Sequence, residues 1–160
     1  MMKQMRRHAV FFAVFITTIF FLGTFSAAAA NIPTQEEAQL EMLNHINAER
    51  EKNGLNPLVM DETLTEIASE HAVDMIVRDY FSHWSPEKLS PGDRMRNADV
   101  PFRVMGENLA GNSSVSHAHS MLMNSPSHRA NILNERFNKV GVSIIDGSKY
   151  GMMMVMKFTN

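Results

Sequence analysis

The sequence predicts an α/β domain in which helices cover both faces of a sheet. Two segments repeat apolar residues at helical spacing, and each begins with residues that cap helices. Near the end of the chain two runs rich in Val, Ile and Met are typical of strands, and neither has a polar face. A strand that is apolar on both sides must be covered on both sides, so helices should flank the sheet.

Residues 1–30 predict a secretory signal peptide that precedes this domain. The first seven residues include three basic ones, an apolar stretch follows over residues 9–25, and residues 26–30 are all small. These are the three parts of a secretory signal. The apolar stretch is also nearly long enough to span a bilayer, which leaves an uncleaved membrane anchor as the alternative. We expect cleavage before Asn31, with a single domain over residues 31–160.

The first two helices are predicted from local capping signals. Thr34 opens the sequence Thr-Gln-Glu-Glu, which forms a capping box, and the helix should continue to the stop signal Asn53-Gly54. Asp61 is the expected N-cap of the second helix, whose apolar face extends to Met75.

The later elements are shorter. A turn-rich stretch follows the second helix and includes a short helix over residues 92–98. Another helix is predicted over residues 114–124, where a Ser-Pro pair ends it. The strands over residues 140–145 and 152–158 are expected to be joined by a turn at residues 146–148.

The mature chain is acidic and has no cysteine. It carries 12 lysines and arginines against 17 acidic residues, a formal charge of −5. No basic patch remains to attract DNA or RNA, so nucleic acid is excluded as a partner. Without cysteine, zinc sites with thiolate ligands and thiol nucleophiles are excluded. The chain also has no disulfides, although exported proteins reach compartments that permit them. A chain of about 130 residues can bury a core that needs no such cross-link.

Four of the six histidines in the mature chain have structural interpretations. His45 lies between glutamates on a helix and is expected to be solvated. His71 lies on an apolar stripe, which is typical of a hydrogen-bonded core residue. His117 and His119 are two positions apart, so a helix would point them to different faces.

His83, Glu107 and His128 are the candidates for chemistry. Each histidine lies beside Ser-Pro turn signals, so both are expected in loops, where binding and catalytic residues concentrate. Glu107 follows a glycine and is expected at an abrupt change of chain direction. The three positions are 24 and 21 residues apart, and this spacing leaves open whether they form one site.

Seven motifs together resemble the CAP superfamily, whose domain is also called SCP or PR-1-like, in its compact bacterial secreted form. They occur in the family's order from residue 40 to about residue 145. The motifs are LNHINAER at 43–50, NGLNPL at 53–58, YFSH at 80–83, SPGDR at 90–94, GENLA at 106–110, NSPSHRANIL at 124–133 and VGV at 140–142.

The resemblance implies a three-layer α-β-α sandwich with a central, mainly antiparallel sheet. It also implies a surface cleft lined by two histidines and two glutamates. His83, the glutamate of the GEN motif Glu107, and His128 match three of these four. The helix before His128 carries no carboxylate where the family has its other glutamate. Asn124 is the nearest polar substitute, and Glu87 is a further candidate.

Other residues beside these motifs are expected to support the cleft. Ser125 and Trp84 adjoin the two histidine motifs. Arg129 is expected to pair with an acidic neighbour, and Asn131 to hydrogen-bond loop backbone. Gly106 and Gly141 are expected to permit close backbone approach.

The histidines also suggest a metal. Two neutral imidazoles are good ligands for Zn²⁺ or another divalent cation, with Glu107 as a third ligand and positions left for water. The alternative is a His–Glu hydrogen-bond network that only orders the loops.

Three functions are compatible with this sequence. The leading one is an extracellular or cell-envelope binding module for a lipid, glycan or protein. The second is a secreted metal-dependent hydrolase with Glu107 as general base. The third is an envelope structural protein, which contacts the membrane only if the N-terminal segment stays uncleaved. Fold alone does not decide among them.

Overall fold

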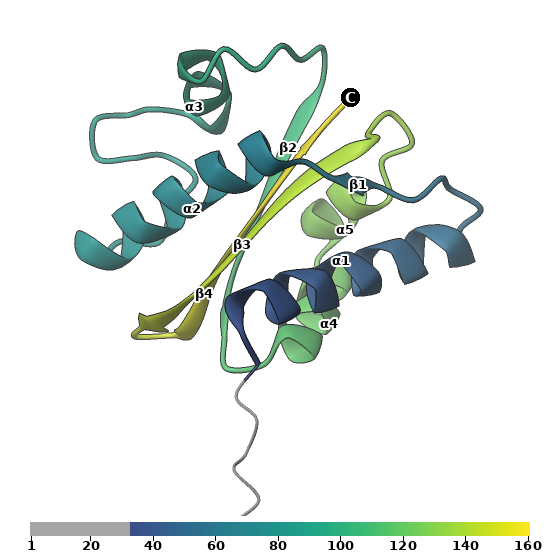
Figure 1. The fold of residues 1–160 in the computed structure, drawn as a ribbon, viewed down its shortest axis with the longest axis horizontal. Helices are drawn as coiled ribbons and strands as arrows, with labels where there is room; N and C mark the ends of the chain where they lie inside the picture. The colour runs from purple at the N-terminus through teal and green to yellow at the C-terminus, as the bar shows by residue number, and fades with distance from the viewer. Residues whose placement is uncertain (1–32) are drawn as a thin grey trace, which may run out of the picture. The chain divides into compact units, whose positions relative to one another are not determined.

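A four-stranded mixed sheet lies at the centre of the structure, a computed structural model that describes residues 33–160 (Figure 1). The predicted signal peptide lies outside these residues. The strands lie in the order β1-β3-β4-β2, where β1 pairs in parallel with β3 and the other pairs are antiparallel. The expected mainly antiparallel sheet is therefore confirmed. The strands are β1 (Val59–Met60), β2 (Met105–Asn112), β3 (Lys139–Ser148) and β4 (Gly151–Thr159).

Helices cover both faces of this sheet, which confirms the α-β-α sandwich (Figure 1). One face carries α1 (Gln35–Lys52), α4 (Val115–Asn124) and α5 (Pro126–Ile132). The other face carries α2 (Glu62–Val77) and α3 (Pro91–Asn97). No helix within residues 33–160 combines the length and the hydrophobicity needed to cross a membrane.

Local capping explains where the helices begin. The Thr34 hydroxyl accepts the backbone N–H of Glu37 at 3.2 Å, and the Glu37 carboxylate accepts the N–H of Thr34 at 2.7 Å. This reciprocal pair is the predicted capping box. Asp61 caps α2 by accepting the N–H of Leu64 at 3.0 Å. Both predicted N-caps are confirmed.

The central strand β4 divides its side chains between two cores. Met154, Met156 and Phe158 pack into the cluster beneath α1, α4 and α5. Met153 and Val155 pack beneath α2. These methionines fill core space as predicted. Lys157 shares the α2 side and is fully buried, although it is charged.

Two buried residues hold distant segments together. The Arg50 guanidinium donates to the backbone carbonyls of Asn56, Ile132, Asn134 and Phe137 at 2.8–3.1 Å, which ties α1 to the end of α5. At Gly141, α2 crosses β3 so closely that a Cβ would collide with the backbone of Leu64.

Two elements that position the candidate site were not predicted. β2 has few β-branched residues, yet it forms a full ladder with β4 over eight register positions. Glu107 therefore lies within a strand and not at an abrupt turn. The helix α5 begins directly after α4, because a proline at a first helical position is favourable. His128 therefore lies on a helix, and its expected place in a loop was wrong.

The last hairpin also differs from its prediction. β3 continues through residues 146–148 to Ser148, and the chain reverses at Lys149 and Tyr150. A register irregularity between Ile145 and Ser148 accommodates the longer strand.

Candidate functional site

Glu107 lies at the centre of the candidate site, and its carboxylate is almost completely buried. The Nδ1 atom of His83 lies 2.8 Å from its Oε1 atom, and the Lys157 ammonium donates to Oε2 at 2.5 Å. The Arg94 guanidinium donates to both oxygens at 3.2–3.3 Å. Both oxygens are therefore already hydrogen-bonded to groups of the protein.

This arrangement keeps Glu107 ionised. Burial raises the pKa of Glu107, but the hydrogen bond from His83 and the charges of Lys157 and Arg94 outweigh it and lower its pKa to about 2. Burial lowers the pKa of Lys157, and the charge of Glu107 opposes that effect. The glutamate and its two cations thus form a buried ionic cluster.

The ionised carboxylate sets the tautomer of His83. A carboxylate only accepts hydrogen bonds, so Nδ1 of His83 must carry the proton that is shared with Glu107. In the neutral imidazole this leaves the lone pair on Nε2. The side chain is 42% exposed, so His83 combines a fixed ring with access to solvent.

Partly buried hydrogen bonds also hold the loop that carries His83. The Arg94 guanidinium donates to the His83 carbonyl at 2.7 Å. One residue earlier, the Ser82 carbonyl lies 3.0 Å from Nε2 of the buried His71. His71 is therefore the hydrogen-bonded core residue that its sequence position predicted. Burial lowers the pKa of His71 to about 4, which keeps its ring neutral.

Two asparagines connect Glu107 to the helix of His128. The Asn131 amide donates to the Glu107 carbonyl at 3.2 Å and to the Asn108 side chain at 2.8 Å. Asn108 in turn donates to the His128 carbonyl at 3.0 Å. Asn131 therefore binds strand backbone, and not loop backbone as expected. A Cβ at Gly106 would lie 2.8 Å from the Asn131 side chain, which explains the glycine there.

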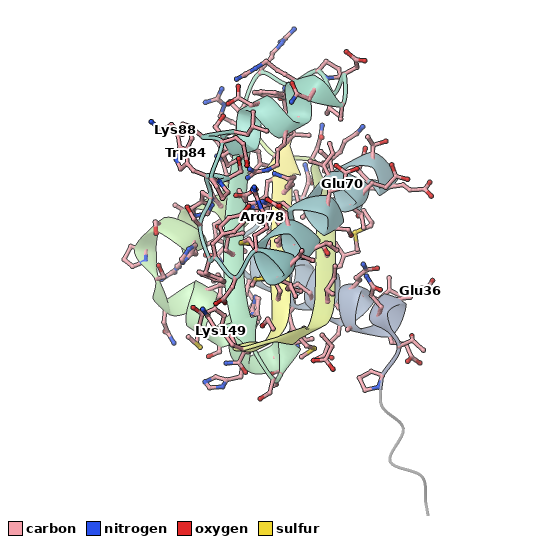
Figure 2. All side chains as sticks on the ribbon, turned by 90° about the vertical axis from the view of Figure 1, so that its left-hand side faces the viewer. Glu36, Glu70, Arg78, Trp84, Lys88 and Lys149 are labelled. Carbon is pink, nitrogen blue, oxygen red and sulfur yellow. The ribbon has the colours of Figure 1, made fainter. Side chains whose placement is uncertain are left out.

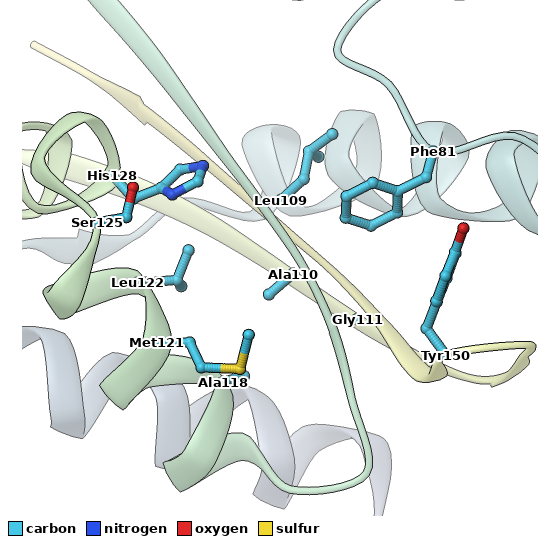
Figure 3. Close-up of a pocket in the computed structure, with 10 residues that line it drawn as sticks. All are labelled: Phe81, Leu109, Ala110, Gly111, Ala118, Met121, Leu122, Ser125, His128 and Tyr150. Carbon is cyan, nitrogen blue, oxygen red and sulfur yellow. The ribbon is translucent and has the colours of Figure 1, made fainter.

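His128 belongs to the same region as His83. Burial lowers the pKa of His128, and the nearby His83 lowers it further. His128 also lines an apolar cavity of about 370 Å³ that adjoins this region (Figure 3). The cavity lies between α4 on one side and the loop of Phe81 with the β3–β4 turn on the other. Its lining consists of Phe81, Leu109, Ala110, Gly111, Ala118, Met121, Leu122, Ser125, His128 and Tyr150.

Other predicted supporting residues lie apart from the ionic cluster. Trp84 is 56% exposed and projects from the loop between α2 and α3 (Figure 2). Asn124 is exposed at the end of α4. Arg129 is exposed too, and it influences Glu49 through its charge. Glu87 pairs with Arg78, the residue that caps the C-terminus of α2.

Two cluster residues, Arg94 and Lys157, were missed as site residues. Arg94 follows a Ser-Pro-Gly-Asp capping sequence, which suggested only a helix start. Lys157 offered a clearer signal, because it is the one charge in a strand that is otherwise apolar on both sides. A charge in such a strand needs a buried partner.

The described residues contain no group of three or more His, Asp or Glu side chains placed to hold a metal. The imidazoles of His83 and His128 are therefore the candidate metal ligands, and imidazole nitrogen is a ligand that suits Zn²⁺ and similar ions. Glu107 as a direct third ligand stays a prediction, and its oxygens are engaged by His83, Lys157 and Arg94.

Comparison with known sequences gives consistent matches. The model of the cysteine-rich secretory protein family, CAP, matches residues 43–158. The uncharacterized protein YkwD of Bacillus subtilis is 37% identical over 125 residues, which cover 78% of this chain and 48% of that protein. The uncharacterized membrane protein YlbC of the same organism is 34% identical over 69% of this chain and 32% of its own length. The chain thus spans about half or less of these relatives.

Solved structures give the same fold. An extracellular protein containing a SCP domain from Bacillus anthracis superposes with a TM-score of 0.73 at 31% identity, over 79% of this chain and 41% of that chain. An outer surface protein of Borrelia burgdorferi has a TM-score of 0.74 at 24% identity, over 80% of this chain and 96% of that chain. The latter likeness concerns the fold alone.

Proposed function

Because this chain belongs to the cysteine-rich secretory protein (CAP) family, we propose that it functions as a binding module outside the cytoplasm. Its ligand would occupy the cleft beside His83 and His128. One similar structure supports the location, since the Bacillus anthracis protein is described as extracellular. The predicted signal peptide over residues 1–30 agrees with export.

The ionisation and hydrogen bonding of Glu107 favour a binding function over a hydrolytic one. A general base works best when its pKa lies near the operating pH and when it can reach a water molecule. The pKa of Glu107 is lowered to about 2, and three neighbouring side chains occupy its two oxygens. It is therefore a weak base with little room for water. This observation disfavours the metal-dependent hydrolase.

The same cluster prepares His83 for a ligand. Glu107 holds Nδ1, so Nε2 presents its lone pair in a fixed direction. A carboxylate behind a histidine is the arrangement that orients metal-binding imidazoles in many proteins. His83 and His128 would hold Zn²⁺ or a similar ion, with Glu107 behind His83. Such an ion would polarise an oxygen atom of the ligand.

The cavity next to His128 supports a ligand with apolar groups. Most of its lining is aliphatic or aromatic, with Ser125, His128 and the hydroxyl of Tyr150 as the polar groups. Among the expected partners, this favours an extracellular or cell-envelope lipid or protein segment over a glycan.

Zinc titration tests the histidine cleft. We expect calorimetry to detect Zn²⁺ binding to the wild-type chain, and His83→Ala and His128→Ala each to abolish it. Glu107 is expected to affect zinc affinity indirectly, by orienting the ring of His83. The fluorescence of Trp84, which follows His83 in the chain, is expected to change when Zn²⁺ binds. His45→Ala is the matched control, because His45 stacks on His119 at 5.1 Å and this pair is the rival imidazole site. Zinc binding that survives both cleft substitutions and disappears in the control would place the ion at that pair.

Turnover assays test the choice of function. We expect no hydrolysis of peptide, ester or glycan substrates, with or without Zn²⁺. The wild-type chain could instead hydrolyse a substrate, and Glu107→Gln could abolish that activity without changing the folded fraction. This outcome would favour the metal-dependent hydrolase.

A further inference from the structure

The outer edge of β2 borders the apolar cavity. β2 is the last strand of the sheet, and within residues 33–160 it pairs with β4 alone. Leu109, Ala110 and Gly111 are consecutive, yet all three line the same cavity. Successive side chains of a strand point to opposite faces of the sheet. A cavity that all three reach must therefore extend along the edge of the strand and border its backbone.

The hydrogen bonds show which backbone groups point outward. The Glu107 carbonyl accepts from the Asn131 side chain, so it points away from β4. Backbone direction alternates along an antiparallel strand, so the N–H and C=O groups of Leu109 and Gly111 point the same way. Within residues 33–160 no turn or loop backbone bonds to these groups, and no second strand lies beside them. This edge therefore offers alternating donors and acceptors.

Large exposed apolar side chains stand on both sides of this edge (Figure 3). On the α2 side, the rings of Phe81 and Tyr150 meet edge to face at 5.3 Å, and they are 41% and 45% exposed. On the α4 side, Met121 is 53% exposed next to Leu122. Exposed apolar groups gathered around one cavity are typical of an interaction site.

We propose that the apolar cavity binds an extended apolar peptide segment of a partner protein, which adds as a strand to the free edge of β2. This inference rests on the proposed binding function and names the chemistry of its ligand. Peptide backbone carries N–H and C=O groups at the spacing that Leu109 and Gly111 require. A lipid tail has neither, so it would cover those groups without satisfying them.

The two walls define the side chains of this peptide. Alternate side chains of an added strand would point toward Phe81 and Tyr150, and the others toward Met121 and Leu122. Because both walls are apolar, neighbouring peptide residues should both be apolar. The edge from Leu109 to Gly111 accommodates about three residues, roughly 10 Å of extended chain.

Selection from a random heptapeptide display library on the full chain is the first test. We expect enrichment of sequences with adjacent apolar residues at their centre. Absence of any enriched peptide would overturn the proposal. It would leave the proposed histidine cleft intact, because the zinc titration measures that site separately.

Backbone methylation of an enriched peptide tests strand addition itself. N-methyl groups at alternate positions, which would face β2, should weaken binding about tenfold or more, because each removes a donor and adds bulk. N-methyl groups at the intervening positions, which face solvent, should have little effect. Equal effects at both sets of positions would contradict the pairing.

Amide exchange locates the peptide on the protein. We expect binding to slow hydrogen exchange at Leu109 and Gly111, and to leave Ala110, which already points toward β4, unchanged. Tyr150→Ala and Met121→Ala should each weaken binding about tenfold. Val77→Ala is the matched control, since Val77 is an exposed apolar residue on α2 outside the cavity. A bound peptide that leaves both β2 amides unprotected would refute the proposal.

Discussion

Glu107 on β2 and Lys157 on β4 lie directly opposite each other on neighbouring strands, with Nζ and Oε2 2.5 Å apart and both side chains buried. Each charge reduces the cost of burying the other. The pair also fixes the backbone of β2 beside the cleft. Glu107 therefore supports the strand as well as His83.

Removing one member of this pair should destabilise the protein strongly. Glu107→Gln leaves Lys157 buried without a counter-charge, and we expect a loss of about 3–5 kcal/mol in the free energy of unfolding. Urea unfolding measures it. Lys157→Met should cost less, because Arg94 and His83 still bind Glu107. The double variant should recover part of the loss. A Glu107→Gln protein as stable as wild type would contradict the account of this cluster.

Stability should fall between pH 6.5 and pH 4 because of His71. Its pKa in the folded protein is lowered to about 4, so the unfolded chain binds more protons throughout this window. The contribution of His71 is complete above about pH 6.5 and decreases by about 3 kcal/mol as the pH falls to 4.

The control for this window is His71→Gln, which should flatten the dependence on pH while keeping a donor for the Ser82 carbonyl. Urea midpoints measured from pH 8 to pH 4 compare the two proteins. Glu107 acts in a lower window, since its stabilisation is lost only as the pH falls from about 4.5 toward 2. Parallel curves for wild type and His71→Gln would show that His71 is not responsible.

Arg50→Met should cost about 3–5 kcal/mol, because four backbone carbonyls lose their donor in a buried site. Arg50→Lys should also destabilise, since an ammonium cannot match the planar fork of a guanidinium. Lys52→Met is the matched control on the same helix, where the side chain is 68% exposed, and it should change stability by about 0.5 kcal/mol or less. Thermal unfolding compares all three variants.

Gly141→Ala should be among the most damaging of the small substitutions. Its Cβ would meet the backbone of Leu64 and Thr65, so α2 must move away from β3, at a cost of about 3 kcal/mol or more. Gly92→Ala on α3 is the control, because its Cβ would meet only the mobile end of Arg96 and the ring of Phe102 at 3.4 Å or more. That change should be neutral or stabilising by about 0.5–1 kcal/mol. Similar denaturation midpoints for the two alanine variants would refute the close approach.

Local physics was enough to predict several elements from sequence. Thr34 and Asp61 accept hydrogen bonds from backbone N–H groups three residues away. The starts of α1 and α2 are therefore specified by the local sequence. The methionines of β4 likewise showed that both faces of the sheet would be covered. The family motifs identified His83, Glu107 and His128 as candidates for one cleft.

By itself, then, the sequence determined the capped helices, the doubly covered sheet and the identity of the candidate residues. The tertiary structure decided that residues 105–112 form a strand, because the ladder with β4 outweighs their weak strand propensity. It also decided what Glu107 does. Lys157 lies 50 positions further along the chain, and only sheet register places its ammonium on that carboxylate. Charge interactions depend on distance in space, so no local pattern around Glu107 could reveal that its oxygens were already occupied.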